Sequence, residues 1–338
     1  MDIRIGLIVG MEDDFPRAFI ERAARQPGVR AELASIGGVR ERYERTYDVL
    51  IDRLSHEVPF YRFFLKTAAL RGTYCINDPF WWAADDKFFG YSLAAELGVA
   101  VPRTVMLPSR DYIPAIDKQK SLRNLEFPLD WEAIASYVGF PAILKPADGG
   151  GWKNVWRVDN LEQLMRTYNE TATLVMVLQE FIDFEEYVRC LCVGRDTVLP
   201  IQYDPKNRRY VRSGKFLGGD LEKRVVEDAY RLNDALGYDM NSVEFAIKDG
   251  VAYAIDFTNP APDMYQWSLG DPYFDIALDE MVRFAIQAGR ERTERRARPQ
   301  RPLGHGHDYL WWNEAARQAP PFAWVGGDEP GRRVNRVR

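Results

Sequence analysis

Apolar residues in the first 80 positions alternate between short continuous runs and helical spacing. Residues 3–9 and 47–54 form apolar runs typical of buried strands, and residues 30–36 predict a shorter strand between them. Residues 15–26 and 61–71 carry apolar side chains at helical spacing. This order of strands and helices predicts a small parallel sheet that is covered on both faces.

After residue 80 the pattern becomes mixed, and we place a domain boundary near residue 85. The segment from Asp85 to Gly98 is strongly helical, and an extended stretch follows it. Predicted strands and helices then come in no fixed order. The strands cover residues 103–107, 142–145, 155–158, 173–179 and 186–193, and the helices cover residues 131–138 and 161–170.

Two pairs of apolar runs in the later half have the spacing of hairpins. Residues 198–203 and 210–215 flank a basic, polar turn, which fits two antiparallel strands. Residues 242–248 and 252–257 flank an Asp-Gly pair, which is a strong signal for a tight hairpin turn. With a helix over residues 221–236, this half is expected to be an α+β unit.

These patterns divide the chain into three parts. Residues 1–84 are expected to form an α/β domain, and residues 85–287 a larger mixed domain. Residues 288–338 include the charged, proline-flanked run GRERTERRARPQR, which predicts a linker and a loosely attached tail.

Composition limits the classes of partner and the cellular location. A formal net charge of -5 provides no positive field for nucleic acid or for an anionic membrane surface. The apolar run at the N-terminus is too short for a signal peptide, and no stretch approaches the ~20 apolar residues that span a bilayer. We therefore expect a cytoplasmic protein without nucleic-acid or membrane partners.

Cysteine and histidine usage disfavours a zinc site. The cysteines are odd in number, and Cys190 and Cys192 lie in an apolar stretch where a strand would place both on one face. We expect them to be reduced, buried thiols. His305 and His307 lie two residues apart in an expected flexible loop, so they are interpreted as surface residues.

The segment PAILKPADGGGWKNV holds the first candidate chemistry. Three consecutive glycines after a strand allow backbone N–H groups to approach an anion, and Lys145 and Lys153 supply positive charge on either side. The segment is not a Walker A loop, because its glycine-to-lysine spacing differs and no Ser or Thr follows a lysine. A flexible surface turn is the alternative interpretation of this segment alone.

Two further segments carry candidate nucleotide and metal ligands. The strand that ends in QEFI would place backbone groups where a purine edge can bind, although an ordinary strand end followed by an acidic loop is the alternative. Glu244 and Asp256 lie inside apolar runs on the two strands of the Asp-Gly hairpin. Two buried carboxylates repel unless a cation lies between them, and with the amide oxygen of Asn259 they suit Mg²⁺. The alternative is that Glu244 faces solvent.

Taken together and in this order, these segments resemble the ATP-grasp superfamily of carboxylate-amine and carboxylate-thiol ligases, which share a glutathione synthetase-like ATP-binding fold. The resemblance covers about residues 85–282. It implies that residues 1–84 are the small domain that precedes the ATP-grasp fold, and that residues 85–287 are a two-lobed ATP-grasp domain. Its ATP lobe would cover about residues 100–180 and its metal lobe about residues 181–287.

The resemblance also implies roles for individual residues. DDKFFGYSLAAELGVAVPRT is similar to the family's opening segment, which makes Lys87 the first phosphate-binding lysine and Lys145 the second. Arg189 matches a strand arginine that contacts the γ-phosphate in related ligases, so Arg189 and Lys145 are the candidate catalytic residues. The other implied nucleotide contacts are the loop residues Gly149, Gly150, Gly151 and Lys153, the hinge residues Gln179, Glu180, Phe181 and Ile182, and Glu186 for the ribose with Asp183 as its alternative.

The implied metal set is Glu244, Asp256 and Asn259, which would hold Mg²⁺ with Mn²⁺ as the alternative. The chain departs from the family pattern here, because two residues separate Asp256 from Asn259 where the family usually has one. Either a bulge places Asn259 correctly, or Thr258 occupies the ligand position. Glu244 stands where many relatives have Asp, a change that a flexible carboxylate tolerates.

The implied activity is ATP- and Mg²⁺-dependent ligation, in which a carboxylate forms an acylphosphate that an amine or similar nucleophile captures. The substrates would be a small-molecule carboxylate and amine, or a peptide, and the family admits a homo-oligomer. We expect specificity to come from the N-terminal domain and from the basic loop containing Arg208, Arg209, Arg212 and Lys215, for each of which a solvated turn is the alternative. A small-molecule kinase and a non-catalytic ATP-binding protein are competing hypotheses.

Overall fold

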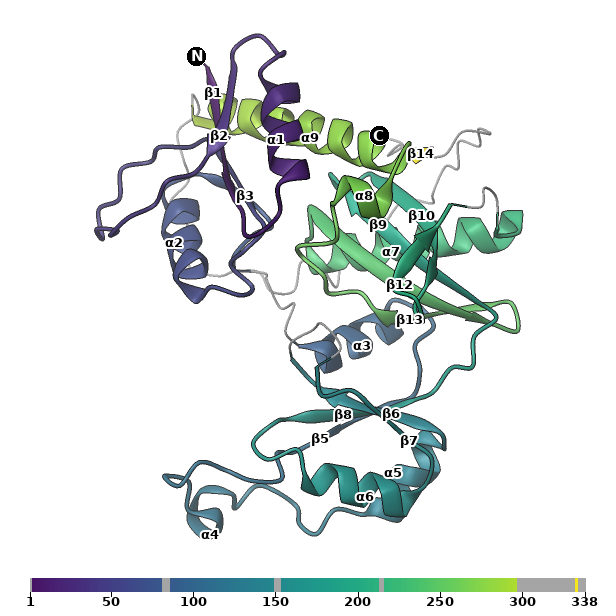
Figure 1. Cartoon of the computed structure of the whole chain (residues 1–338). Coiled ribbons are helices and arrows are strands. Elements are labelled where there is room, and N and C mark those ends of the chain that lie inside the picture. The colour runs from purple at the N-terminus through teal and green to yellow at the C-terminus, as the bar shows by residue number, and fades with distance from the viewer. Residues whose placement is uncertain (1, 81–85, 149–152, 213–215, 297–331, 334–338) are drawn as a thin grey trace. The chain divides into compact units, whose positions relative to one another are not determined.

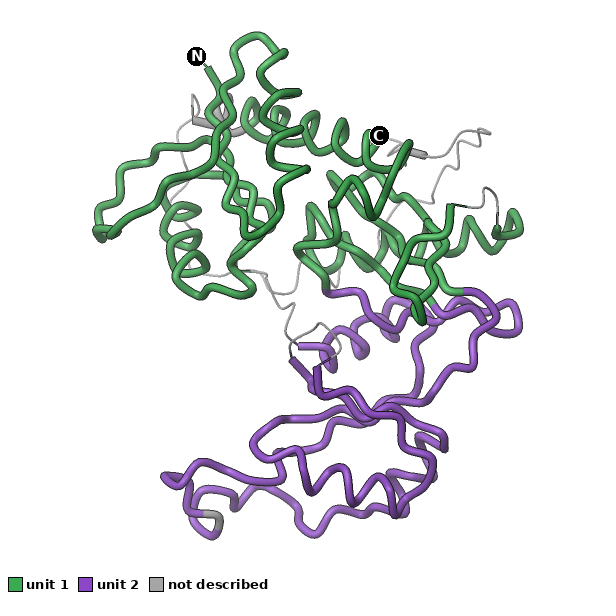
Figure 2. Tube along the Cα trace, in the orientation of Figure 1, with its two compact units in different colours: residues 1–82, 187–245, 259–338 green, residues 83–186, 246–258 purple. Residues whose placement is uncertain are grey.

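The computed structural model describes residues 2–80, 86–148, 153–212, 216–296 and 332–333. The chain divides into two compact units (Figure 2). The first unit comprises Met1–Trp82, Tyr187–Phe245 and Asn259–Arg338, and the second comprises Ala83–Glu186 and Ala246–Thr258. Residues 187–245 thus share a unit with the N-terminal residues, whereas the sequence patterns group them with residues 85–186. The three-part domain division stays a prediction.

The N-terminal part of the first unit is the parallel sheet that the sequence predicts (Figure 1). Its elements are β1 (Ile3–Ile8), α1 (Asp14–Ala23), β2 (Val29–Leu33), β3 (Val49–Asp52), α2 (Pro59–Leu70) and β4 (Tyr74–Ile76). The strand order is β2-β1-β3-β4, and every neighbouring pair is parallel. Ile5 and Val49 lie opposite each other in the register of β1 and β3, and both are fully buried. Burial of the apolar strands on both faces therefore determines this sheet.

Helix α9 (Tyr273–Arg296) packs against the same sheet and against α1. Gly289 allows the close approach, because a Cβ atom there would lie only 2.6 Å from Cγ2 of Ile3. Arg22 on α1 binds Asp279 and Asp275 of α9 at 2.7 and 2.9 Å. The helix also covers residues 288–296, where the charged composition predicts the start of a linker. Gly289 lies in this stretch and still packs against Ile3 of β1. Among the described residues, no helix is both long and apolar enough to cross a membrane.

A six-stranded sheet contains the two hairpins that the sequence predicts. Its order is β11-β10-β9-β12-β13, with β14 paired to β10. The boundary between the units passes through β12. A short helix, α8, follows β13 and was not indicated by the sequence pattern. The bounds are β9 (Glu186–Val193), β10 (Thr197–Asp204), β11 (Arg209–Val211), α7 (Gly219–Leu236), β12 (Met240–Lys248), β13 (Val251–Asp256), α8 (Gln266–Leu269) and β14 (Arg332–Arg333).

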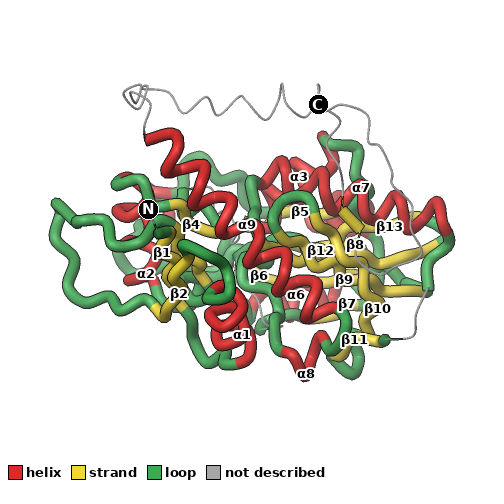
Figure 3. The backbone as a smooth tube through the Cα atoms, turned by 90° about the horizontal axis from the view of Figure 1, so that it is seen from above, coloured by secondary structure: helices red, strands yellow, loops and turns green. Residues whose placement is uncertain are grey.

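The second unit is built on an antiparallel four-stranded sheet (Figure 3). Its strand order is β5-β8-β6-β7, and its elements are α3 (Lys87–Glu96), β5 (Thr104–Leu107), α4 (Lys118–Ser121), α5 (Trp131–Val138), β6 (Ala142–Pro146), β7 (Trp156–Val158), α6 (Leu161–Asn169) and β8 (Met176–Glu180). Leu144 and Leu178 from the sheet pack with Val138 and Leu164 from α5 and α6 in one buried cluster. The mixed α/β and α+β class predicted from the sequence is confirmed.

Candidate functional site

Lys145 lies on β6 in the second unit, and three oxygen atoms hold its ammonium group. Nζ donates to the hydroxyl oxygen of Tyr91 at 2.7 Å, to Oε1 of Gln179 at 2.9 Å and to the carbonyl oxygen of Ile255 at 3.3 Å. An ammonium has three N–H donors, so these acceptors match its full donor capacity. The structure thus joins two predicted nucleotide-binding residues, Lys145 and Gln179, by a direct hydrogen bond.

The register of the sheet explains why Gln179 reaches Lys145. Gln179 on β8 lies opposite Ile143 on β6, and Lys145 is two residues further along the same face. The side chain of Gln179 is buried, and its amide nitrogen donates to Oγ1 of Thr104 at 2.9 Å. Gln179 is therefore fixed at both ends and presents its oxygen to Lys145.

Lys87, the first residue of α3, is connected to the end of β6. Its backbone N–H donates to the carbonyl oxygen of Ala147 at 2.9 Å, and its side chain is 9% exposed. Asp86 caps the helix by accepting from the backbone N–H of Phe89 at 2.9 Å. The two predicted phosphate-binding lysines of the second unit therefore lie on elements whose backbones are hydrogen-bonded to each other.

The predicted hinge after β8 has most of its polar groups already paired. The carboxylate of Glu180 binds Arg103 through two bonds of 2.9 and 3.0 Å, and its backbone N–H donates to the carbonyl oxygen of Arg103 at 2.9 Å. The backbone N–H of Phe181 donates to the carbonyl oxygen of Pro141 at 3.3 Å. Ile182 is buried and Asp183 is exposed. An adenine role for this segment stays a prediction, and the Glu180 side chain serves an ion pair.

Hydrogen bonding to Arg103 lowers the pKa of Glu180 below its usual range. A lowered folded-state pKa means that the pair stabilises the fold above the ordinary pKa of 4.5, and that this contribution is lost as pH falls through the folded-state value. We expect Glu180→Gln to flatten the fall in the free energy of unfolding between about pH 5 and 3. Urea unfolding over this pH range measures it. Glu162→Gln, at a carboxylate 88% exposed, is the control, and equal slopes for all three proteins would contradict the prediction.

The structure describes only some of the other predicted nucleotide ligands. Gly149, Gly150 and Gly151 lie outside the described residues, and Lys153 is exposed in the turn before β7. Glu186 begins β9 and is half-buried. The structure leaves both Glu186 and Asp183 as candidates for the ribose.

Arg189 and Glu244 form a buried ion pair in the first unit. Nη2 of Arg189 donates to Oε1 of Glu244 at 2.6 Å, and the hydroxyl of Tyr187 donates to Oε2. The guanidinium carbon lies 3.9 Å from the ring centroid of Tyr203 and 5.8 Å from that of Tyr210, which is cation–π geometry. Burial acts to lower the pKa of Arg189, but the charge of Glu244 and the neighbouring tyrosines together outweigh it and raise that pKa. Glu244 is 5% exposed, so the alternative in which it faces solvent is wrong.

The predicted metal ligands fall on both units. Glu244 and Asn259 belong to the first unit, and the half-buried Asp256 and the buried Thr258 belong to the second. The backbone N–H of Asn259 donates to Oδ1 of Asn241 at 2.7 Å. Within the described ranges, no three His, Cys, Asp or Glu side chains gather into a metal site. The donor set of two carboxylates and an amide or hydroxyl oxygen still suits Mg²⁺, and the choice between Thr258 and Asn259 stays open.

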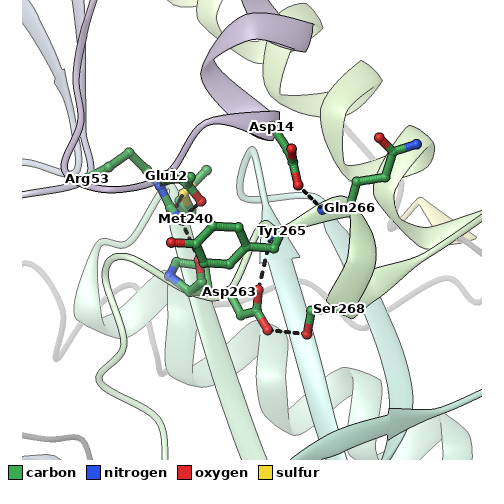
Figure 4. Close-up of polar contacts among 9 residues, drawn as sticks. Glu12, Asp14, Arg53, Met240, Asp263, Tyr265, Gln266 and Ser268 are labelled. Carbon is green, nitrogen blue, oxygen red and sulfur yellow. Dashed lines mark hydrogen bonds and ion pairs between the residues drawn. The ribbon is translucent and has the colours of Figure 1, made fainter.

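A second buried ion pair of the first unit was missed by the sequence patterns. Glu12 follows β1 and Arg53 follows β3, and their side chains are joined by bonds of 2.7 and 2.8 Å (Figure 4). Arg53 also donates to the carbonyl oxygen of Pro262 at 2.6 Å. The available signal was that Arg53 comes directly after β3 and Glu12 lies in the segment after β1, since the carboxyl ends of these parallel strands meet at one edge of the sheet. This pair connects that edge to the segment after β13.

The segment that precedes α8 is held by local bonds. Asp263 accepts from the hydroxyl of Ser268 and from the backbone N–H of Tyr265, as Figure 4 shows. Arg212, expected as a cation for substrate, donates instead to the carbonyl oxygens of Trp267 and Ser268, each at 3.1 Å. The basic loop is thus partly used for holding α8. Lys215 lies outside the described residues.

Comparison with known proteins gives a consistent set of relatives. No protein-family model matches the chain. D-alanine–D-alanine ligase from Ralstonia nicotianae is 26% identical over 161 residues, which cover 41% of this chain and 48% of that protein. The chain therefore spans about half the length of this curated relative.

Solved structures match over a longer part of the chain. D-alanine–D-alanine ligase from Bacillus anthracis is similar with a TM-score of 0.61 at 19% identity, covering 87% of this chain and 99% of that one. A second structure of the same enzyme contains ATP and has a TM-score of 0.58. The ATP-grasp ligase PsnB, solved with a minimal precursor, Mg and ADP, has a TM-score of 0.55 at 14% identity and covers 85% of this chain and 98% of that one.

Proposed function

Because the chain has the ATP-grasp fold, we propose that it is an ATP- and Mg²⁺-dependent ligase that joins a carboxylate to an amine or similar nucleophile. The observation that carries this proposal is the hydrogen-bonding of Lys145. Its ammonium contacts Gln179 at the end of the hinge strand and the carbonyl oxygen of Ile255, the residue before Asp256. The ammonium of Lys145 therefore links its own strand, β6, to β13, the strand that carries the predicted metal ligand Asp256.

The proposed reaction has two steps. A carboxylate oxygen of the substrate attacks the γ-phosphorus of ATP, the bond to the bridging oxygen breaks, and ADP leaves. The amine nitrogen then attacks the acyl carbon and loses a proton, and phosphate leaves with the former carboxylate oxygen. Such reactions need positioning and charge neutralisation more than a general base.

Each predicted residue has a role that matches its chemistry. Lys87 and Lys145 would bind the phosphates, and Arg189 would stabilise charge on the transferred phosphoryl group. Glu244 and Asp256, with Asn259 or Thr258, would hold Mg²⁺ or Mn²⁺. The metal, when bound, neutralises charge on the phosphate oxygens. Tyr187 and Arg189 each donate to one carboxylate oxygen of Glu244, and each oxygen has a second lone pair with which it could bind a metal.

The names of the similar proteins indicate a class of substrate. The curated relative and the Bacillus anthracis structure are D-alanine–D-alanine ligases, and another structure of PsnB contains a precursor peptide. We propose a small carboxylate and amine, such as two amino acids, or a peptide. We place the reaction in the cytoplasm, since Cys75, Cys190 and Cys192 are free thiols.

A coupled assay of ADP release tests this function. The purified protein is incubated with ATP, Mg²⁺ and a panel of amino acids, dipeptides, small dicarboxylates and acidic peptides. We expect at least one pair of substrates to stimulate ADP release above the rate with ATP alone, with a new amide in the products by mass spectrometry. Absence of stimulation across the panel would count against a ligase, and a stable phosphorylated substrate would indicate a kinase.

A further inference from the structure

The hydroxyl group of Tyr91 connects two functional strands of the second unit. It accepts from Nζ of Lys145 on β6 at 2.7 Å and donates to the carbonyl oxygen of Ile255 on β13 at 2.7 Å. Tyr91 is 4% exposed, and its ring lies edge-on to the ring of Phe257 with centroids 5.5 Å apart. The residue is not part of the nucleotide or metal sets predicted from the sequence.

Helix α3 brings Tyr91 to this position and keeps it close to β13. A Cβ atom on the neighbouring Gly90 would lie 3.1 Å from Cε2 of Phe257, so a larger side chain there would push the helix away. The same helix begins at Lys87, whose backbone is bonded to Ala147 at the end of β6. One helix thus contacts both strands, and its tyrosine hydroxyl bonds to both.

Lys145 has to exchange a present hydrogen bond when its ammonium binds a phosphate oxygen. A phosphate oxygen that binds Nζ has to take over at least one N–H, because Tyr91, Gln179 and Ile255 match the three that the ammonium has. The bond to Ile255, at 3.3 Å, is the longest of the three. When it breaks, the Tyr91 hydroxyl still donates to the Ile255 carbonyl, so the backbone before Asp256 keeps its hydrogen bond.

We propose that Tyr91 is a positioning residue, which orients Lys145 for phosphate and at the same time holds the end of β13 that carries Asp256. The inference rests on the proposed function, because it gives Lys145 and Asp256 their phosphate and metal roles. It adds that the two roles are coupled through one hydroxyl group. Loss of the hydroxyl then weakens nucleotide binding and also raises the Mg²⁺ concentration that binding requires.

The test is calorimetric titration of the non-hydrolysable analogue AMPPNP into wild-type protein and Tyr91→Phe over a series of Mg²⁺ concentrations. The phenylalanine keeps the ring against Phe257 and removes only the oxygen. Loss of one hydrogen bond to a charged group predicts binding weaker by about tenfold to 100-fold. The half-saturating Mg²⁺ concentration is expected to rise as well, which a purely structural role would not produce.

Tyr168→Phe is the matched control. Tyr168 is 3% exposed in the same unit, and its hydroxyl donates to the carbonyl oxygen of Pro108 at 2.8 Å. Both variants lose a buried tyrosine-to-carbonyl bond, so similar shifts in thermal midpoint are expected, but Tyr168→Phe should bind AMPPNP like wild type. Equal AMPPNP affinity and equal Mg²⁺ dependence in the two variants would overturn the coupling. A wild-type protein that binds no AMPPNP would instead overturn the proposed function, and the inference with it.

Discussion

Replacement of Lys145 by methionine is expected to lower the rate of substrate-stimulated ADP release by about 10²–10³-fold, the usual effect of removing one preorganised group that stabilises transition-state charge. Methionine has nearly the same length but carries no charge and no N–H donor. The variant therefore loses the phosphate contact and leaves Tyr91, Gln179 and Ile255 without their shared donor. Steady-state kinetics at saturating ATP measures the loss.

Lys120→Met provides the control for this variant. Lys120 lies in the same unit on α4, its side chain is 84% exposed, and its ammonium lies 3.7 Å from Asp117. Removing this exposed charge should leave ADP release unchanged. Comparable rates for the Lys145 and Lys120 variants would mean that Lys145 has no part in the chemistry.

Replacement of Arg189 by methionine is expected to lower both stability and turnover. Glu244 is 5% exposed, so removing Arg189 leaves its buried charge without this counter-charge, which costs about 3–5 kcal/mol of unfolding free energy. The double variant Arg189→Met with Glu244→Gln removes that charge and should recover most of the stability. It should not recover turnover, because the proposed contact to the γ-phosphate is still missing and a proposed metal ligand is lost as well. Urea unfolding and ADP release measure the two effects separately.

An exposed arginine pair is the control for the stability effect. Arg103 and Glu180 are bonded at 2.9 Å, but the arginine side chain is 50% exposed. Arg103→Met should therefore cost at most about 1 kcal/mol, because solvent screens the pair. A double variant at Arg189 and Glu244 that stays as unstable as Arg189→Met would show that the pair is not what stabilises this region. Full turnover in the double variant would remove Arg189 from the catalytic set.

Much of the fold follows from local patterns along the chain. The apolar runs around Ile5 and Val49 indicate buried strands, and their order with the intervening helices favours the parallel sheet that is observed. The helix predicted over residues 131–138 has the same bounds in the structure. Asp130 caps its start, and Gly139, with a φ of 81°, ends it. Elements with such local signals were predictable, and the ATP-grasp resemblance supplied their arrangement.

Features that depend on distant partners were not predictable from one sequence. Tyr91 reads as one of many aromatic core residues, and only the folded chain brings its hydroxyl to Lys145, 54 positions away. The Glu12–Arg53 pair and the engagement of Arg212 by α8 are of the same kind. The length of α9 was missed because packing of Gly289 against Ile3 outweighs the charged composition that follows.

The direct test of the central claim uses a carboxylate substrate, found with the ADP-release panel, that carries ¹⁸O in its carboxyl group. Ligation through an acylphosphate transfers one of these oxygens to phosphorus and leaves it there when the amine displaces phosphate. We expect ¹⁸O in the inorganic phosphate, seen as an isotope shift in the ³¹P NMR spectrum and formed in step with ADP. ADP formation with unlabelled phosphate, or with a stable phosphorylated substrate, would contradict it.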